Sequence, residues 1–187
     1  MVIDLRKTLR RTIVIVLVIT IIASGIAAFR FLFPVRHLDL VRHFAAEHSL
    51  EPALVMAVIN AESRFRPNAE SHAGAKGLMQ IMDTTAAWIA ERAGLDGYAE
   101  RVFDPAANIA MGTWYIAYLL GLFEYEQTAL AAYNAGQGRV RDWLNNPEHS
   151  SDGVTLDNIP FSETRNYVQR VARNQRVYQF LLRWFYR

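Results

Sequence analysis

The sequence predicts a mostly α-helical domain preceded by one N-terminal transmembrane helix. A mainly apolar run near the N-terminus is long enough to cross a bilayer. The rest of the chain has apolar residues at helical spacing, and no stretch of alternating polarity indicates a strand. We therefore divide the chain into a basic tip with a membrane anchor, residues 1–36, and a helical domain, residues 37–187.

Length and composition fit one domain with an appendage. The chain has 187 residues, and 52% of them are apolar, which is ample for a buried core. It has no cysteine, which excludes disulfides, thiolate metal sites and a lipid-modified cysteine. Residues 1–36 carry six basic residues and one acidic residue, so the formal net charge of +2 leaves the helical domain acidic. We see no cluster of basic residues in this domain that would indicate nucleic-acid binding.

The anchor is predicted from residues 12–33. Four basic residues between Arg6 and Arg11 precede the run, and Arg30 near its far end could extend its side chain to the lipid headgroups. At about 1.5 Å per residue the run spans roughly 33 Å, enough for the bilayer core. The basic residues before it place the N-terminus in the cytoplasm and the domain outside. A signal peptide cleaved near Gly25-Ile26-Ala27 is the alternative. We favour an uncleaved anchor because the apolar run continues past that site.

The sequence of the helical domain predicts six successive helices. Their expected ranges are 37–48, 52–62, 86–93, 105–122, 126–135 and 162–186, with a polar loop at 145–157. Asp104 and Pro105 suit the N-cap and first position of the fourth helix. The aromatic residues of 105–122 are dense enough to stack on sugar rings, but because of their helical spacing we expect most of them to lie in the core. His43 and Glu47 lie one helical turn apart, but no third ligand accompanies them, so we interpret them as solvated residues rather than a metal site.

The helix at 52–62 ends in a carboxylate. Pro52 suits its first turn, and no residue from Ala53 to Ile59 is polar, so the helix should be buried on most sides. Both desolvation and the negative end of the helix dipole raise the pKa of Glu62. A carboxyl that stays protonated near neutral pH suits a general acid. The alternative is a helix-end residue that points into water.

Four segments carry a family resemblance. They are Glu62-Ser63-Arg64-Phe65-Arg66-Pro67-Asn68 with Ser71, then Gly77-Leu78-Met79-Gln80-Ile81-Met82, then Ala132-Tyr133-Asn134-Ala135-Gly136, and finally Ile159-Pro160 with Glu163-Thr164-Arg165-Asn166-Tyr167-Val168. In this order they resemble the motifs of the family 1 lytic transglycosylases, whose soluble-lytic-transglycosylase domain cleaves bacterial peptidoglycan. The resemblance covers about residues 38–185. Asp83 departs from it, since the family usually has proline there; together with Thr84 and Thr85, Asp83 could cap the following helix.

The resemblance implies a lysozyme-like domain with a glycan cleft between helical lobes. It makes Glu62 the catalytic residue and implies substrate-side roles for Ser71, Met79, Gln80, Tyr133, Asn134 and Tyr167. Ser71 would contact substrate or Glu62, and the Tyr133 hydroxyl would lie beside Glu62 and orient its carboxyl. Gln80 is also notable without the resemblance, because an amide within an apolar run needs hydrogen-bond partners. No metal and no cofactor is implied.

The implied reaction is non-hydrolytic cleavage of the β-1,4 bond between N-acetylmuramic acid and N-acetylglucosamine, which leaves 1,6-anhydromuramyl ends. The expected partners are peptidoglycan glycan strands and the lipid around residues 12–33, and unidentified wall-machinery proteins are further candidates. The expected location is the bacterial inner membrane, with a single span and the catalytic domain on the periplasmic face. The alternatives are a hydrolase of the goose-lysozyme kind and a non-catalytic wall-binding module, and an intact Glu62 argues against the second.

Overall fold

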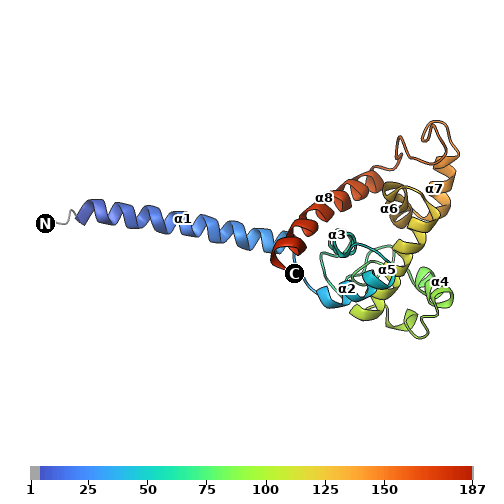
Figure 1. The fold of residues 1–187 in the computed structure, drawn as a ribbon, viewed down its shortest axis with the longest axis horizontal. Coiled ribbons are helices and arrows are strands. Elements are labelled where there is room, and N and C mark those ends of the chain that lie inside the picture. The colour runs from blue at the N-terminus through green and yellow to red at the C-terminus, as the bar shows by residue number, and fades with distance from the viewer. Residues whose placement is uncertain (1–4, 187) are drawn as a thin grey trace. The chain divides into compact units, whose positions relative to one another are not determined.

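In the computed structural model, which describes residues 5–186, the chain divides into two compact units with the boundary after Pro34. The first unit holds one helix, α1 (Leu5–Leu32), and the second holds all the other described helices (Figure 1). The division falls two residues before the expected boundary at residue 36. Residues 1–4 of the expected anchor segment, and Arg187, lie outside the described residues.

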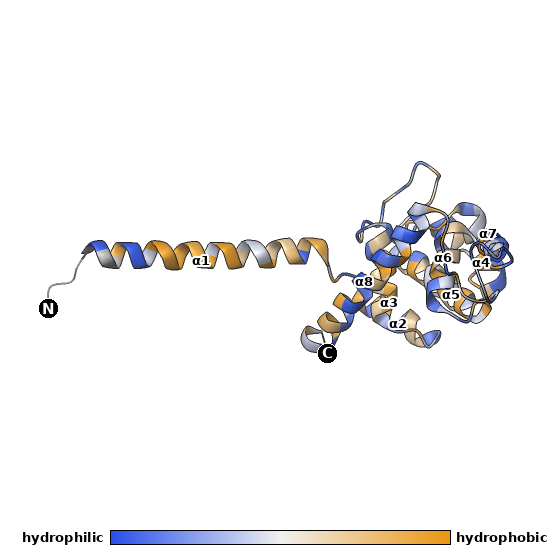
Figure 2. Cartoon of the chain, turned by 90° about the horizontal axis from the view of Figure 1, so that it is seen from above, coloured by the Kyte–Doolittle hydropathy of each residue, from blue (hydrophilic) through white to orange (hydrophobic). Residues whose placement is uncertain are grey.

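Helix α1 confirms the expectation of one N-terminal helix that could span a membrane. Its 24 residues from Leu9 to Leu32 are long and apolar enough to cross a bilayer. At 1.5 Å per residue they reach about 36 Å. The side chains of this stretch are exposed, and the hydropathy colouring of the ribbon turns from hydrophilic to hydrophobic beyond its first turns (Figure 2).

The domain is built from helices, and its two longest connections are residues 63–82 and 145–161. The helices are α2 (Leu38–Glu47), α3 (Pro52–Glu62), α4 (Asp83–Ala93), the 3₁₀ turn η1 (Ala99–Arg101), α5 (Pro105–Leu122), α6 (Glu126–Ala135), α7 (Gln137–Leu144) and α8 (Ser162–Phe185). The described residues contain no strand, only two isolated β-bridges, which both involve Lys76. The mostly α-helical fold is therefore confirmed.

Helix α3 lies at the centre of the domain. Every residue from Ala53 to Asn60 is buried, as the absence of polar residues in most of that stretch predicts. The long helix α8 packs along α3, and α2 packs on it as well (Figure 1). The far end of α3, with Glu62, is thereby held in place by elements distant in sequence.

Of the two predicted N-caps, the structure confirms that of α5 but not that of α4. Asp104 caps α5 as predicted, with its carboxylate accepting a hydrogen bond from the Ala107 N–H at 2.9 Å. Asp83 does not cap α4: the N-cap residue is Met82, and Asp83 is the first helical residue. Its carboxylate binds the Lys76 ammonium at 2.7 Å instead. An acidic residue in the first turn still favours the helix dipole.

The expectation that most aromatic residues of α5 lie in the core is wrong. The helix buries Ile109, Ile116 and Leu119, which recur at helical spacing. Its aromatic residues Trp114, Tyr115 and Tyr118 are only partly buried. The aliphatic positions are sufficient to attach α5 to the core, so the rings are left at the surface.

Candidate active site

Glu62 is the last residue of α3 and is partly exposed. Burial raises the pKa of its carboxyl to about 7, because the charged form loses its hydration. The pKa would be higher without the Tyr167 hydroxyl and the positive charge of Arg170, which both stabilise the carboxylate, whereas the negative charge of Glu163 raises it further. The carboxyl can therefore hold a proton near neutral pH and can also release it.

The backbone changes direction directly after this acid. Arg64 and Phe65 both adopt the left-handed conformation, with φ of 53° and 59°. Such a conformation is costly for residues with a side chain and persists only where the surroundings impose it. Here the Phe65 ring is fully buried, with its centroid 6.2 Å from that of Tyr178. The Ser63 hydroxyl donates to the Leu78 carbonyl oxygen at 2.7 Å, which ties the end of α3 to the loop that follows.

The loop of residues 66–82 is held from α5 by Asn108, a residue that the sequence analysis missed. The Asn108 amide oxygen accepts from the Met79 N–H at 2.7 Å, and its nitrogen donates to the carbonyl oxygens of Lys76 and Val102. Asn108 is fully buried. At Gly77, with φ of 78°, an added Cβ would lie 2.3 Å from the Asn108 amide nitrogen, so the loop approaches the helix closely enough to require glycine.

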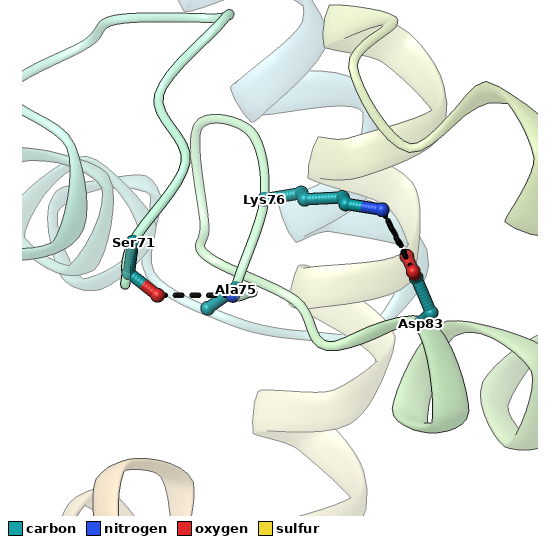
Figure 3. Close-up of polar contacts among 4 residues, drawn as sticks. All are labelled: Ser71, Ala75, Lys76 and Asp83. Atoms are coloured by element: carbon teal, nitrogen blue, oxygen red, sulfur yellow. Dashed lines mark hydrogen bonds and ion pairs between the residues drawn. The ribbon is translucent and has the colours of Figure 1, made fainter. Parts of the chain in front are cut away.

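Ser71 and Gln80 stabilise the same loop. The Ser71 hydroxyl oxygen accepts from the Ala75 N–H at 3.0 Å, next to the Lys76–Asp83 ion pair (Figure 3). The Gln80 amide nitrogen donates to the carbonyl oxygens of Ala69 at 3.1 Å and Gly77 at 2.9 Å. The partners expected for the Gln80 amide are therefore backbone groups of the loop. Both side chains remain partly exposed.

The expectation of a substrate-binding Met79 side chain is corrected by its burial. Met79 is fully buried and packs so closely on α5 that a Cβ at Gly112 would lie 2.3 Å from its sulfur. The exposed methionine of this motif is Met82, with 39% of its surface accessible. Gln80, with φ of 51°, turns the chain between the two. Neither helical nor strand periodicity applies across such a turn.

Two tyrosines lie close to Glu62. The nearby Glu62 charge adds to burial in raising the pKa of both Tyr133, on α6, and Tyr167, on α8. The Tyr133 hydroxyl donates to the Met79 carbonyl oxygen at 2.8 Å. The Tyr167 hydroxyl is buried without a hydrogen-bond partner among the described residues, and its proximity lowers the pKa of Glu62. Catalytic hydrogen bonds are often long in the absence of substrate.

A cluster of half-exposed rings continues from Tyr133. The centroid of the Tyr133 ring lies 5.4 Å from that of Tyr115. The rings of Trp114 and Tyr118 stack with their centroids 5.5 Å apart. Trp88, on α4, contacts Trp114, Tyr115 and Tyr118 edge-on. We call Trp88, Trp114, Tyr115 and Tyr118 the aromatic surface. Asn134 follows Tyr133 at the end of α6 and is half-buried.

The described residues offer no metal-binding cluster. No three histidine, aspartate or glutamate side chains gather within residues 5–186. The His43 Nε2 lies 3.4 Å from a Glu47 carboxylate oxygen, and both side chains are exposed, as expected for a solvated helical pair.

Comparison with known protein families shows which family has this sequence and fold. Residues 39–154 match the family model described as the transglycosylase SLT domain. The chain belongs to the transglycosylase SLT family. Curated relatives include the soluble lytic murein transglycosylase of Escherichia coli K12, with 37% identity over 154 residues. That match covers 80% of this chain and 24% of the relative, so the chain spans about a quarter of that protein's length.

A second relative carries a membrane designation in its name. The membrane-bound lytic murein transglycosylase C of Actinobacillus pleuropneumoniae serotype 5b (strain L20) is 34% identical over 168 residues. The match covers 76% of this chain and 46% of that protein.

Solved structures of SLT family members share the fold. An inactive mutant of the lytic transglycosylase Slt from Pseudomonas aeruginosa superposes with a TM-score of 0.72 at 34% identity, over 83% of this chain and 27% of that one. A complex of the 70-kDa soluble lytic transglycosylase with bulgecin A gives a TM-score of 0.71, also at 34% identity, over 80% of this chain and 25% of that one. The lysozyme-like transglycosylase fold predicted from the sequence is confirmed.

Proposed function

We propose that this chain is a membrane-anchored peptidoglycan lytic transglycosylase. The observation that carries the proposal is the Glu62 carboxyl, whose pKa burial raises to about 7 in a domain of the SLT family. Such a group can give up a proton and take one back at neutral pH. The names of the curated relatives, lytic murein transglycosylases, support the same reaction.

In the proposed reaction Glu62 serves first as acid and then as base. Its proton passes to the glycosidic oxygen as the bond from that oxygen to C1 of the muramyl residue breaks. The resulting carboxylate accepts the proton of the C6 hydroxyl, while O6 bonds to C1 and closes the 1,6-anhydro ring. Glu62 is protonated again at the end, and no water is consumed. The C6 hydroxyl belongs to the same sugar, so its effective concentration at C1 is high.

The neighbouring residues would position this acid. Tyr167 and Arg170 stabilise the carboxylate formed between the two steps, because both lower the pKa of Glu62. Tyr133 and Gln80 would hold the 66–82 loop beside it, since both donate hydrogen bonds to its carbonyl oxygens. Ser71, Asn134 and the exposed Met82 are the remaining candidates for substrate contact in the motifs.

The aromatic surface would receive further sugar rings of the strand. Tyr115 of this surface contacts Tyr133, with ring centroids 5.4 Å apart, and the Tyr133 hydroxyl lies close to Glu62. Half-exposed rings offer flat apolar faces with polar tips, which suits the apolar faces and hydroxyl edges of sugars. A polymeric substrate that extends from the acid along α5 is consistent with this arrangement.

A hydrolase would need a second carboxylate near the scissile bond. Asp83 is engaged by Lys76, with an ammonium-to-carboxylate distance of 2.7 Å. Glu163 is the carboxylate whose charge acts on Glu62, and it stands in the first turn of α8, where an acidic residue favours the helix dipole. Glu163 is therefore the first candidate for that second carboxylate, and Glu70, exposed in the 66–82 loop, is the other.

Helix α1 would anchor the enzyme in the inner membrane. Its apolar stretch has the length of a single span, and the basic residues ahead of it favour a cytoplasmic N-terminus. The catalytic domain would then face the periplasm, where its substrate lies. The lipid around residues 12–33 and the glycan strands are the two proposed partners.

The proposal is tested by the release of soluble fragments from purified peptidoglycan. The full chain should release fragments, and the Glu62→Gln chain should bind the same material without releasing them. Equal binding without release by both chains would identify a wall-binding module and overturn the enzymatic proposal.

A further inference from the structure

The last turns of α8 expose three aromatic side chains. Phe180, Trp184 and Phe185 have 54%, 60% and 67% of their surface accessible, and the rings of Phe180 and Phe185 touch with centroids 6.0 Å apart. We call these three residues the α8 aromatic patch. The same turns bury Tyr178 and Leu181 against the domain, so the helix end is firmly packed on its inner side. Exposed aromatic groups on a well-packed element mark an interaction surface.

Basic residues flank the patch. Arg173 and Arg176 precede Phe180 by seven and four residues and are exposed on the same side of the helix. The Arg183 guanidinium lies 5.6 Å from the centre of the Trp184 ring. Glu163, the single acidic residue of α8, stands at the opposite end of the helix. At 1.5 Å per residue that end is about 30 Å away.

This composition fits the headgroup region of a bilayer. Tryptophan is enriched there because one part of its ring system is apolar and the other donates a hydrogen bond. Arginine side chains bind anionic phosphates while their stems lie on apolar surface. The Glu51 carboxylate also lies at this end of α8 and accepts a hydrogen bond from the Gln179 amide at 2.9 Å.

The patch is tied to the beginning of the domain. The Arg42 guanidinium of α2 donates a hydrogen bond to the main-chain oxygen of Tyr186, directly after α8. Helix α2 begins at Leu38, and α1 ends at Leu32. The five connecting residues can extend at most about 20 Å, counting the bonds at either end. If α1 spans a bilayer, covalent connection alone keeps the end of α8 near its surface.

We propose that Phe180, Trp184 and Phe185 insert into the outer headgroup region of the bilayer that holds α1. Arg173, Arg176 and Arg183 face the lipid phosphates beside them. This inference rests on the membrane anchor of the proposed function and adds a second attachment point to it. Because α8 packs along α3, the contact would fix how the end of α3, with Glu62, is presented to the wall.

Fluorescence quenching by brominated lipids tests the contact. The full chain is reconstituted into vesicles of phosphatidylcholine and phosphatidylglycerol, with bromines near the headgroup end of the acyl chains. Trp184 is one of four tryptophans, and helix α1 contains none. Bromolipid should quench part of the emission, and Trp184→Phe should abolish most of that quenching. Trp143→Phe, which removes a buried tryptophan, is the matched control and should preserve it.

Failure of the anchor and failure of the patch give different results. If the chain does not sediment with the vesicles after an alkaline wash, the anchor is wrong. If it sediments but Trp184→Phe leaves the quenching unchanged, the patch contact is overturned. Because the chain has no cysteine, Trp184→Cys introduces a single thiol. Efficient disulfide formation between copies in the vesicles would instead assign the patch to a protein interface and would also overturn the proposal.

Discussion

The Tyr133 hydroxyl donates a hydrogen bond of 2.8 Å to the main-chain oxygen of Met79. Its proton is therefore used to hold the 66–82 loop, although the sequence resemblance implies that Tyr133 orients Glu62. Tyr167 is the tyrosine that lowers the pKa of the Glu62 carboxyl. Tyr133 therefore holds the loop, and Tyr167 stabilises the Glu62 carboxylate.

Glu62→Gln should nearly abolish cleavage. The amide matches the carboxyl in shape but can neither donate the proton nor accept it back. Loss of a general acid–base typically costs about 10²–10⁴-fold in rate, and one group serves both steps here. Initial rates with a soluble glycan oligomer measure the effect. A variant that retains more than a tenth of the activity would remove Glu62 from the mechanism.

Tyr167→Phe should move the alkaline limb of the pH profile upward. The wild-type kcat/KM should fall as the pH rises through about 7, because Glu62 loses its catalytic proton there. Removing the Tyr167 hydroxyl destabilises the carboxylate, raises the pKa of Glu62 and keeps the acid protonated to higher pH. Tyr133→Phe is the matched control and should leave the limb in place. A limb that stays fixed in the Tyr167 variant would contradict this role.

Glu62→Gln should stabilise the domain at alkaline pH. The pKa of Glu62 rises from 4.5 to about 7 on folding, so between these values the folded state binds more protons than the unfolded state. The free energy of unfolding therefore falls as the pH rises through this window. The uncharged amide escapes this loss. Thermal melts should show a higher Tm for the variant above pH 7 and little difference below pH 4.5. Equal Tm values above pH 7 would mean that the carboxylate is well solvated, and a lower Tm for the variant would mean that the folded protein stabilises the charge; either result contradicts the raised pKa.

Asn108→Ala should destabilise the loop and lower activity. It leaves the Met79 N–H and the carbonyl oxygens of Lys76 and Val102 without their partner in a buried site. The cost should be about 2–3 kcal/mol. Urea unfolding measures it. The exposed loop residue Asn158 provides the control, and its replacement by alanine should change stability by less than about 0.5 kcal/mol. Equal effects of the two substitutions would refute the role of Asn108.

Much of the fold follows from local signals. The apolar run predicts α1, and Pro52 with the unbroken apolar stretch after it predicts a buried α3 that ends at Glu62. Asp104 and Pro105 predict the start of α5. Each of these signals depends on residues within a few positions of one another, so no knowledge of tertiary contacts is needed.

The site was less predictable because it depends on contacts between distant segments. Whether Met79 or Met82 is exposed depends on the left-handed turn at Gln80, which no periodicity describes. The different roles of Tyr133 and Tyr167 depend on where α6 and α8 pack. Asn108 did leave a signal, since an amide in a mainly apolar helix has to find buried partners.

The chemical nature of the products tests most directly whether this chain is a lytic transglycosylase. Fragments released from purified peptidoglycan are treated with borohydride and analysed by mass spectrometry, with the reaction run in ¹⁸O-labelled water. A lytic transglycosylase should give ends lighter by one water than hydrolytic ends, resistant to reduction and free of ¹⁸O. Glu163→Gln should still give these products, with the alkaline limb moved to lower pH, because Glu163 raises the pKa of Glu62. Reducible ends that carry ¹⁸O, together with loss of activity in the Glu163 variant, would identify a lysozyme-like hydrolase and contradict the account.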